Sequence, residues 1–505
     1  MNENSFLYLS LLLGFSGMTA SQVKKPNILF ICVDDLRPEV GCYKGKNYIK
    51  TPNLDRLAAQ GMSFSNHFAV VPTSGASRYA MLTGRYPVNR TGLSNEACYK
   101  LISGQSEQQT PETFIHQLRR NGYYSVGIGK ISHSTDGYIY EYEEPKSNLL
   151  ELPHSWDEVV FDHGQWGTGW NAFFGFANGS DKFGMESQVK PYECGDTDDD
   201  GYVDGLTANL ALQKLKELAM NDQPFFLGVG FFKPHLPFNA PRKYWDMYDE
   251  ASLPLTPVPD LPENVNKTSL HDSGEFNSYY LGDEDATLDH PVADDYARKL
   301  RHAYFACVSY ADAQVGKLLD ELKRLGLSDN TIVVVWGDHG WHLGDFRMWG
   351  KHTMFDWALR STLIVKSPKS KSKGNCNQVI SAVDIYPTLM ELCRIKTDYP
   401  LDGRSFVALL DKPSHKWNGA VYSYWNHGIT VRTDRYRLTR YFNGKQPEFE
   451  FFDHRVDPNE KQNMIFSLSK KIHPLQHLLE KANTEIYRNY STYPKSISEN
   501  ARARL

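Results

Sequence analysis

One short stretch, VVPTSGASRYAMLTGRYP at residues 70–87, places a hydroxyl and a guanidinium one helical turn apart among small residues. A serine hydroxyl such as that of Ser74 can act as a nucleophile, and a cation such as Arg78 can stabilise negative charge that develops beside it. Small residues also mark turns, and a lone arginine is often a solvated helix charge. The other ionisable residues decide between a plain turn and a nucleophile held beside a cation.

Acidic residues end two of the apolar runs of the chain. These are NILFICVDD (residues 27–35), with Asp34 and Asp35, and TIVVVWGDHG (residues 331–340), with Asp338 and His339. An isolated acidic pair is usually a helix cap or a solvated turn. Three carboxylates at neighbouring strand ends would repel one another without a cation between them. Oxygen ligands favour Ca²⁺ or Mg²⁺ over zinc, so these four residues predict a site for a hard divalent ion.

Positive charge follows the apolar runs in the same way. The candidates are Arg78, Lys130 and His133 (ending YYSVGIGKISH, 123–133), Lys233 or its neighbour His235 (ending PFFLGVGFFKPH, 224–235), and Lys351 in WGKHTMFD. A metal ion surrounded by such groups suits a tetrahedral oxyanion, sulfate or phosphate, because the positive charges neutralise the transition state. Such a site lacks only a nucleophile, and Ser74 supplies one.

The elements that must position these residues follow an α/β pattern. The four runs are almost continuously apolar, which is typical of strands buried on both faces of a parallel sheet. Helical patterns lie between them, in TPNLDRLAAQG, TPETFIHQLRRNG, DGLTANLALQKLKELAM and ADAQVGKLLDELKRLG. Such sheets bind ligands at the carboxyl ends of their strands, so we expect the charged residues to converge on one edge.

The pattern changes toward the C-terminus. AVYSYWNHGITVRTDRYRLTRYF and EFEFFDHRVDPNE alternate in polarity, which predicts a small antiparallel sheet, and KIHPLQHLLEKANTEIYRNY predicts a terminal helix. We therefore divide the chain into a large catalytic domain, residues 21–395, and a C-terminal subdomain, residues 396–505. The Pro-, Asp- and Asn-rich stretch 250–295 indicates a long surface excursion.

The segment from Ser74 to Arg78 resembles the sulfatase signature, in which Cys or Ser is followed by any residue, Pro or Ala, Ser or Ala, and Arg. LTGRYP follows it, as TGR does in that family, and the resemblance continues through GKISH, KPHLPF, DHGWHLG and FFDHRVDPNEKQNM. DDLRP, KPHLPF and SYADAQVGKLL are similar to the iduronate-2-sulfatase-like branch. The resemblance implies an alkaline-phosphatase-like fold, with a large, mostly parallel mixed sheet sandwiched by helices and a smaller C-terminal antiparallel sheet.

The resemblance also implies the chemistry of the site. Ser74 would be converted to formylglycine (3-oxoalanine) by a serine-type maturase, and its hydrated aldehyde would be the nucleophile. The implied ligands of one Ca²⁺ are Asp34, Asp35, Ser74, Asp338 and His339. The other implied roles are orientation of residue 74 by Arg78, sulfate binding by Lys130 and Lys351, proton removal by His133, and assistance to the leaving alcohol by His235.

The same branch implies a substrate class. We expect an exo-acting carbohydrate sulfatase that acts on a sulfated polysaccharide or a glycosaminoglycan-derived sugar, with a 2-O-sulfated uronic acid as the favoured case. Loops 136–170 and 250–295 are expected to set specificity. Trp425, His427 and Arg432 are candidate substrate contacts, although a surface aromatic and a sheet-edge arginine explain Trp425 and Arg432 equally well.

Two competing functions stay open. One is a phosphatase or phosphonate hydrolase of the same superfamily that uses Ser74 or its aldehyde on phosphorus. Such enzymes often bind two metal ions, whereas this sequence offers one clear acidic cluster. The other is a catalytically silent sulfoglycan-binding protein, against which the complete set Arg78, His133, His235 and Lys351 argues.

The net charge and the N-terminal apolar run limit the classes of partner and the location that we expect for the protein. The chain of 505 residues carries a formal net charge of −5, so we expect no nucleic-acid partner. The run FLYLSLLLGFSG is too short to span a bilayer and precedes a small-residue site at MTA. We therefore expect residues 1–20 to be a signal peptide of an exported protein, periplasmic or secreted, with no lipid anchor and no stable membrane insertion. A buried N-terminal helix is the alternative.

The cysteines and one acidic stretch give weaker evidence about function. Seven cysteines are scattered without CxxC spacing, and their number predicts no pairing. DTDDDGYVDG, residues 196–205, resembles the front of an EF-hand loop, but its twelfth position is Thr207 rather than a bidentate glutamate. A helix start fits this stretch better than a second calcium site.

Overall fold

The computed structural model describes residues 24–43, 48–110, 112–142, 144–186, 188–417, 419–442, 448–466, 469–482 and 486. The predicted signal peptide lies outside these residues. Among the described residues, no helix is both long enough and apolar enough to cross a membrane.

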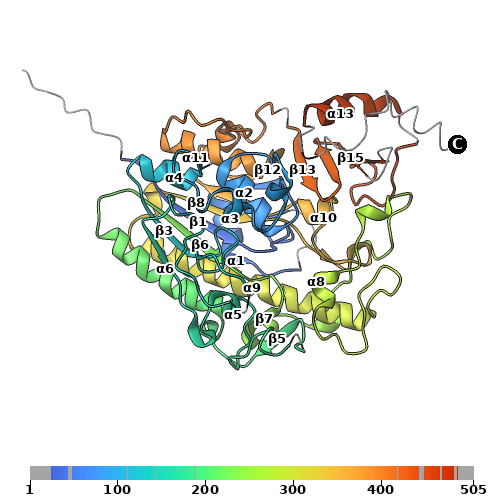
Figure 1. The fold of residues 1–505 in the computed structure, drawn as a ribbon, viewed down its shortest axis with the longest axis horizontal. Helices are drawn as coiled ribbons and strands as arrows, with labels where there is room; N and C mark the ends of the chain where they lie inside the picture. Colours follow the sequence, from blue (N-terminus) through green and yellow to red (C-terminus); the bar gives the residue numbers. More distant parts are fainter. Residues whose placement is uncertain are drawn as a thin grey trace, which may run out of the picture.

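An eight-stranded sheet forms the centre of the molecule, with strand order β12-β2-β11-β8-β1-β6-β3-β4 (Figure 1). Its strands are β1 (Asn27–Val33), β2 (Met62–Phe68), β3 (Tyr124–Gly129), β4 (Glu158–Val160), β6 (Phe225–Phe231), β8 (Thr331–Gly337), β11 (Leu363–Lys366) and β12 (Gly374–Ser381). All neighbours run parallel except β11, which is antiparallel to both β8 and β2. The predicted large, mixed and mostly parallel sheet is confirmed.

The four apolar runs of the sequence form four adjacent strands, β8, β1, β6 and β3. They are apolar throughout because both faces of the sheet are covered. In β1, Leu29 and Ile31 pack into one core, whereas Ile28 and Phe30 pack into the other. All four strands point the same way, so their polar carboxyl ends meet at one edge of the sheet.

Helices form a layer on each face of this sheet (Figure 1). One layer contains α1 (Pro52–Gln60), α6 (Val203–Ala219) and α9 (Asp294–Arg324). The other contains α2 (Ser74–Thr83), α4 (Phe114–Arg120) and α11 (Ile385–Cys393). The helix predicted from residues 311–326 begins much earlier, at Asp294, because DDYARKLRHAYFACVSY continues the same buried face.

The C-terminal part forms the predicted antiparallel sheet, with strand order β13-β14-β15-β16. Its elements are β13 (Val421–Trp425), β14 (Gly428–Arg432), β15 (Tyr436–Tyr441), β16 (Glu448–Asp453) and the helix α13 (Ser469–Lys481). Ile429 and Phe451 of this sheet belong to the same core as Ile28 of the central sheet. The last predicted helical residues, beyond 486, lie outside the described residues.

Short elements fill the connections and carry several site residues. They are α3 (Ala97–Leu101), α5 (Gly169–Phe173), α7 (Arg242–Trp245), α8 (Gly274–Asn277), α10 (Asp356–Leu359), α12 (Val407–Asp411), β5 (Tyr192–Gly195), β7 (Phe238–Pro241), β9 (His342–Leu343) and β10 (Trp349–Gly350). The stretch 250–295 is a long excursion, as predicted, and α8 lies within it.

Candidate active site and metal centre

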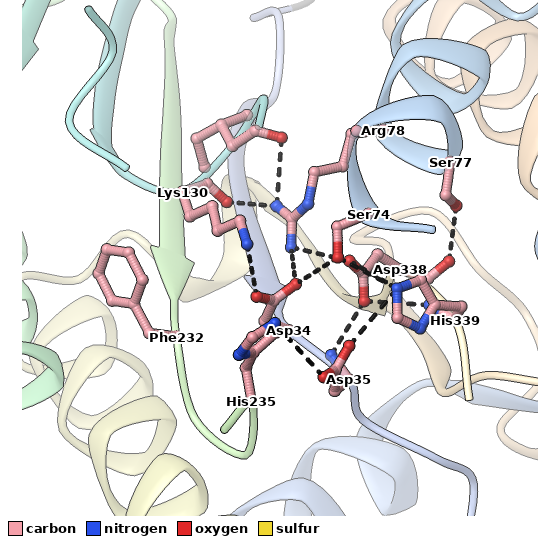
Figure 2. Close-up of polar contacts among 12 residues, drawn as sticks. Asp34, Asp35, Ser74, Ser77, Arg78, Lys130, Phe232, His235, Asp338 and His339 are labelled. Atoms are coloured by element: carbon pink, nitrogen blue, oxygen red, sulfur yellow. Dashed lines mark hydrogen bonds and ion pairs between the residues drawn. The ribbon is translucent and has the colours of Figure 1, made fainter. Parts of the chain in front are cut away.

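The carboxyl ends of β1 and β8 bring the acidic residues together (Figure 2). Asp35 and Asp338 are fully buried, and the backbone N–H of Asp35 donates to Asp338 Oδ1 at 3.0 Å. The backbone N–H of His339 donates to the same oxygen at 3.0 Å. The two acidic clusters of the sequence therefore form one site, as strand-end geometry predicts.

Three of these residues form a compact donor group. One ligand atom each from Asp35, Asp338 and His339 lies within 4.8 Å of the other two. Burial raises the pKa of Asp35 well above its usual range, and burial together with Asp34 raises that of Asp338 to about 6. A cation would relieve this penalty, since it favours ionised carboxylates. Two buried carboxylates and an imidazole therefore fit a divalent metal ion.

Asp34, the fourth predicted ligand, lies beside this group rather than within it. Its Oδ1 accepts hydrogen bonds from Arg78 at 2.8 Å and from Ser74 at 3.2 Å, and its Oδ2 accepts one from Lys130 at 2.7 Å. Burial works to raise the pKa of Asp34, but Lys130 and Arg78 outweigh it and hold the pKa well below its usual range. Asp34 thus connects the metal group to the surrounding cations.

Ser74 is the first residue of α2 and points into the acidic group (Figure 2). Its Oγ lies 3.1 Å from His339 Nε2, in addition to its contact with Asp34. The Asn95 side chain accepts a hydrogen bond from the N–H of Gly75 at 3.0 Å. A side-chain carbon on Gly75 would overlap the backbone of Asn95. The small residues of the signature therefore let the chain pack tightly where Ser74 enters the site.

Arg78 lies one turn further along the same helix and is fully buried. Its Nη2 bonds Asp34 and also Asp338 Oδ2, at 3.2 Å, while Nη1 donates to the carbonyls of Lys130 and Ile131. The guanidinium thus joins the ends of β1, β8 and β3. Arg78 is not a solvated helix charge.

The two predicted anion-binding lysines reach the site from different strands. Lys130 follows β3 and pairs with Asp34. Lys351 follows β10, and its Nζ lies 3.2 Å from Asp35 Oδ1. Burial works to lower the pKa of Lys351, but Asp35 and Glu275 outweigh it, so the ammonium stays charged. Both cations lie beside the carboxylates that a metal ion would neutralise.

Lys233 and His235, the two candidates at the end of one apolar run, have different surroundings. Lys233 Nζ donates to the backbone carbonyls of His235, at 3.2 Å, and Pro237, at 2.6 Å. These bonds stabilise the loop that carries Lys233 itself. The backbone N–H groups of Phe232 and Lys233 donate to Asp204, which holds the start of that loop. His235 faces the site instead.

His235 Nε2 lies 3.8 Å from Asp35 Oδ2. The other His235 nitrogen, Nδ1, lies 2.7 Å from the carbonyl of Leu236, which fixes the orientation of the ring. Burial and then the charge of Lys351 lower the pKa of His235 to about 4. The ring is therefore neutral at neutral pH.

Glu275 was not predicted from the sequence. It lies on α8, where its Oε1 is 3.1 Å from His235 Nε2 and its Oε2 is 3.5 Å from Lys351 Nζ. Burial works to raise its pKa, but Lys351 and His235 hold the pKa well below its usual range. No motif marks this lone acid in a long loop; the only signal was the composition of stretch 250–295.

His133 follows β3 and lies against Trp170, with ring centroids 5.6 Å apart. Burial, and then the charge of Lys130, hold its pKa well below the usual range, so the ring is neutral. Among the described residues, His133 contacts the Trp170 ring and makes no hydrogen bond to Ser74. His133 lines a cavity of about 180 Å³ whose other walls include Tyr99, Tyr138, Tyr140, Tyr142 and Trp170.

The three candidate substrate contacts have different environments. Trp425 stacks on His352, the neighbour of Lys351, with ring centroids 4.9 Å apart and an interplanar angle of 13°. His427 lies in the turn between β13 and β14. Arg432 is 5% exposed and pairs with Asp356, with Nη2 3.2 Å from Oδ2. This pairing favours the structural explanation of Arg432.

The acidic stretch 196–205 precedes a helix, as expected. Asp199 pairs with Lys243 at 2.8 Å and with Lys317 at 2.7 Å, and α6 begins at Val203. Asp196 pairs with Arg242. Within the described part of the chain, this stretch forms no group of metal donors.

The arrangement has the parts needed to hydrolyse an oxyanion ester. A hydroxyl lies beside a metal-donor group, and cations and imidazoles surround it. Residues 26–395 match the sulfatase family, and residues 344–489 match the family described as N-sulphoglucosamine sulphohydrolase, C-terminal. The first match spans most of the chain, so the protein belongs to the sulfatase family of the alkaline phosphatase superfamily and is a sulfuric ester hydrolase.

Individual relatives agree with this assignment. A sulfatase of Formosa agariphila is 29% identical over 96% of this chain and 92% of its own length. Human iduronate 2-sulfatase is 30% identical over 70% of this chain, and the match spans 62% of the human protein.

Solved structures share the fold. A structure in complex with its substrate D-glucosamine-2-N,6-O-disulfate has a TM-score of 0.71 at 21% identity, covering 92% of this chain and 99% of its own. The phosphonate monoester hydrolase of Agrobacterium radiobacter has a TM-score of 0.71 at 21% identity, covering 95% of this chain and 96% of its own. The fold therefore does not separate sulfur from phosphorus substrates.

Proposed function

We propose that the protein is an exo-acting carbohydrate sulfatase that uses residue 74, matured from serine to formylglycine, as its nucleophile. The observation that carries this proposal is the position of Ser74 Oγ, which lies 3.2 Å from Asp34 and 3.1 Å from His339 at the edge of the metal-donor group. A serine-type maturase is the implied partner. Export through the signal peptide at residues 1–20 belongs to the same proposal.

Asp34, Asp35, Asp338 and His339, together with residue 74, would hold one calcium ion. When bound, calcium supplies positive charge that offsets the sulfate, and formylglycine supplies a second hydroxyl that plain serine lacks. Oxygen donors predominate in this set, which favours calcium over zinc.

The chain's own residues divide the remaining work. Arg78 orients residue 74. Lys130 and Lys351 would bind sulfate oxygens when a metal ion neutralises their partners Asp34 and Asp35. Neutral His133 accepts the proton of the nucleophile. The sulfate charge raises the pKa of His235 in the complex, because an opposite charge favours imidazolium, and His235 Nε2 then donates to the leaving alcohol oxygen.

Two features support a saccharide substrate. The cavity beside His133 is lined by five aromatic rings, which offer flat apolar surfaces with polar edges. The iduronate 2-sulfatase relatives support a 2-O-sulfated uronic acid at a chain end. A neutral or amino sugar is the other candidate, since the structure solved with a glucosamine disulfate shares this fold. The role would be in the degradation of sulfated glycans.

The test begins with the mass of the tryptic peptide that carries residue 74, from protein co-expressed with a serine-type maturase. Conversion to formylglycine removes two hydrogens, about 2 Da. A shifted peptide together with hydrolysis of an aryl sulfate is the expected result. An unshifted peptide in protein that hydrolyses phosphate or phosphonate esters would support the phosphorus-directed alternative. An unshifted peptide in protein that binds saccharides but hydrolyses no ester would support the silent binding protein.

A further inference from the structure

Glu275 occupies the outermost position of the charged groups in the active site. Its side chain is 28% exposed, compared with 7% for His235, 5% for Lys351 and 0% for Asp35. The exposed fraction therefore rises from the metal-donor group, through the proposed sulfate-binding and proton-donating residues, to Glu275. A substrate that delivers its sulfate to the buried end would have its sugar ring toward the exposed side of the site, where Glu275 lies.

The carboxylate keeps part of its hydrogen-bonding capacity unused. Oε1 contacts His235, while Oε2, which is a buried atom, lies 3.5 Å from Lys351 and has no hydrogen-bond donor among the described residues. An ionised carboxylate only accepts hydrogen bonds. The group that fills this capacity in a complex must be a donor, such as a hydroxyl or an ammonium.

The cations that act on the site's carboxylates each have an ion-pair or hydrogen-bond partner. Their partners are Asp34 and Asp338 for Arg78, Asp34 for Lys130, Asp35 and Glu275 for Lys351, backbone carbonyls for Lys233, and the Ser278 hydroxyl for Lys182. Metal binding would release Lys130 and Lys351 to the sulfate. A second anionic group on the same sugar would then meet the negative charge of Glu275, which is unfavourable.

We propose that Glu275 accepts a hydrogen bond from a hydroxyl or ammonium group next to the sulfate ester, and so selects a neutral or amino sugar over a uronic acid. This inference rests on the proposed sulfatase function. It names Glu275 as a specificity-determining residue, and it separates the two sugar classes that the relatives leave open. Its contact with His235 is a second, positioning role.

The experiment compares matured wild type with Glu275→Ala, Glu275→Gln and the control Asp283→Asn. Asp283 is exposed in the same loop, so the control removes a like charge without touching the site. The substrates are 4-methylumbelliferyl sulfate, sulfated N-acetylglucosamine and galactose, and a disaccharide ending in a 2-O-sulfated uronic acid. Mono-deoxy analogues of the preferred sugar identify the contacted hydroxyl.

Wild type is expected to prefer a neutral or amino sugar. Glu275→Ala should lower kcat/KM on it by on the order of 10- to 100-fold, since a hydrogen bond to a charged group is lost. For one deoxy analogue, kcat/KM of wild type should fall by the same factor, whereas kcat/KM of Glu275→Ala should not fall further. Glu275→Gln should improve relative turnover of the uronic acid, and Asp283→Asn should match wild type.

Three results would overturn the inference. The first is a wild-type preference for the uronic acid, and the second is unchanged saccharide kinetics in Glu275→Ala. The third is that the loss in kcat/KM from Glu275→Ala and the loss from each deoxy analogue simply add, which would leave Glu275 only its positioning role. The aryl sulfate separates the two levels of failure. If wild type hydrolyses it, only the specificity inference fails; if matured wild type hydrolyses no sulfate ester, the proposed function fails as well.

Discussion

At the scale of single residues, the hydroxyl of Ser74 contributes chemistry and little stability. The start of α2 is held by the Asn95 bond to Gly75 and by Ser77 Oγ, which donates to the Asp338 carbonyl at 2.6 Å. Ser74→Ala should therefore abolish turnover, on the order of a thousand-fold or more, while Tm stays within about 2 °C. Aryl sulfate kinetics and thermal melts measure the two effects.

Ser74→Cys is the matched control for this variant, because the signature admits either residue at this position. Co-expressed with a maturase that accepts cysteine, it should regain the formylglycine mass and the activity. Retention of turnover by Ser74→Ala would show that residue 74 is not the nucleophile.

Asp338 should control metal binding more than intrinsic stability. Burial and Asp34 raise its pKa to about 6, so the ionised carboxylate is costly without a cation. Calcium should raise the Tm of wild type by several degrees at saturation, because it binds only the folded state. In Asp338→Asn this shift should vanish, while the metal-free Tm stays equal to or above that of wild type.

Thermal melts in calcium and in chelator, with metal content by mass spectrometry, check this prediction. Asp283→Asn should behave like wild type in both media. Full activity of wild type after exhaustive chelation would contradict the assignment of a metal site.

The sequence predicted the buried residues of the site well because strand polarity fixes their position. Asp34, Asp35, Asp338 and His339 directly follow apolar runs, so parallel pairing alone brings them together. Glu275 has no such pattern. A glutamate in a loop is expected to be solvated, and its contact with His235 is evident only in the structure.

At the scale of elements, Arg37 ties the loop after β1 to the loop after β8. It is 2% exposed; its Nη1 donates to the Trp341 carbonyl at 2.9 Å and to Asp345 Oδ2 at 2.8 Å. Both loops carry metal donors. The Arg37–Asp345 pair therefore joins the two loops that carry the donor group.

This pair predicts a pH dependence of stability. Burial works to raise the pKa of Asp345, but the charge of Arg37 outweighs it and holds the pKa at about 2, below the ordinary 3.8. The pair's contribution, about 2 kcal/mol, is complete above pH 4 and is lost as pH falls through 2. Asp345→Asn should cost about 3 kcal/mol at pH 7, and this deficit should shrink by about 1 kcal/mol at pH 3.

Urea unfolding at pH 7, 4 and 3 measures the deficit. Asp320→Asn, which breaks an exposed pair with Arg56, is the control and should cost under about 1 kcal/mol. A deficit for Asp345→Asn that grows as the pH falls would have the wrong sign and would refute the assignment.

The elements themselves were predictable where their apolar pattern was strong. The four central strands and the small antiparallel sheet follow the sequence closely, whereas β2, β11 and β12 did not stand out. β2 carries polar residues such as Ser65 and Asn66, which bond Asn375 and the carbonyl of Asn377 on the outer strand β12. The polar residues of β2 prevented its prediction from the sequence, because pairing with neighbouring strands stabilises it rather than a local apolar pattern.

At the scale of the whole molecule, a buried charge network joins the two sheets. Asp356 of α10 contacts Arg432 of β14 at 3.2 Å, and its N–H donates to Glu460 Oε2 at 2.9 Å. Arg437 of β15 pairs with the same glutamate, and His454 Nε2 lies 3.1 Å from Glu460 Oε1. The two arginines balance the two carboxylates, so this second cluster of possible metal donors needs no ion.

Asp356 of this network follows Lys351 by only five residues in the chain, so the network should couple stability to activity. Asp356→Asn and Arg432→Met should each cost about 3 to 5 kcal/mol, because each leaves a buried charge without its partner. The double variant Asp356→Asn/Arg432→Met removes both charges and should recover much of that loss, with a coupling energy on the order of 1 to 3 kcal/mol. Urea unfolding followed by tryptophan fluorescence and circular dichroism measures the cycle, and aryl sulfate turnover should fall with Asp356→Asn. Additive losses would mean that the residues act separately and that the shared apolar core alone joins the two sheets.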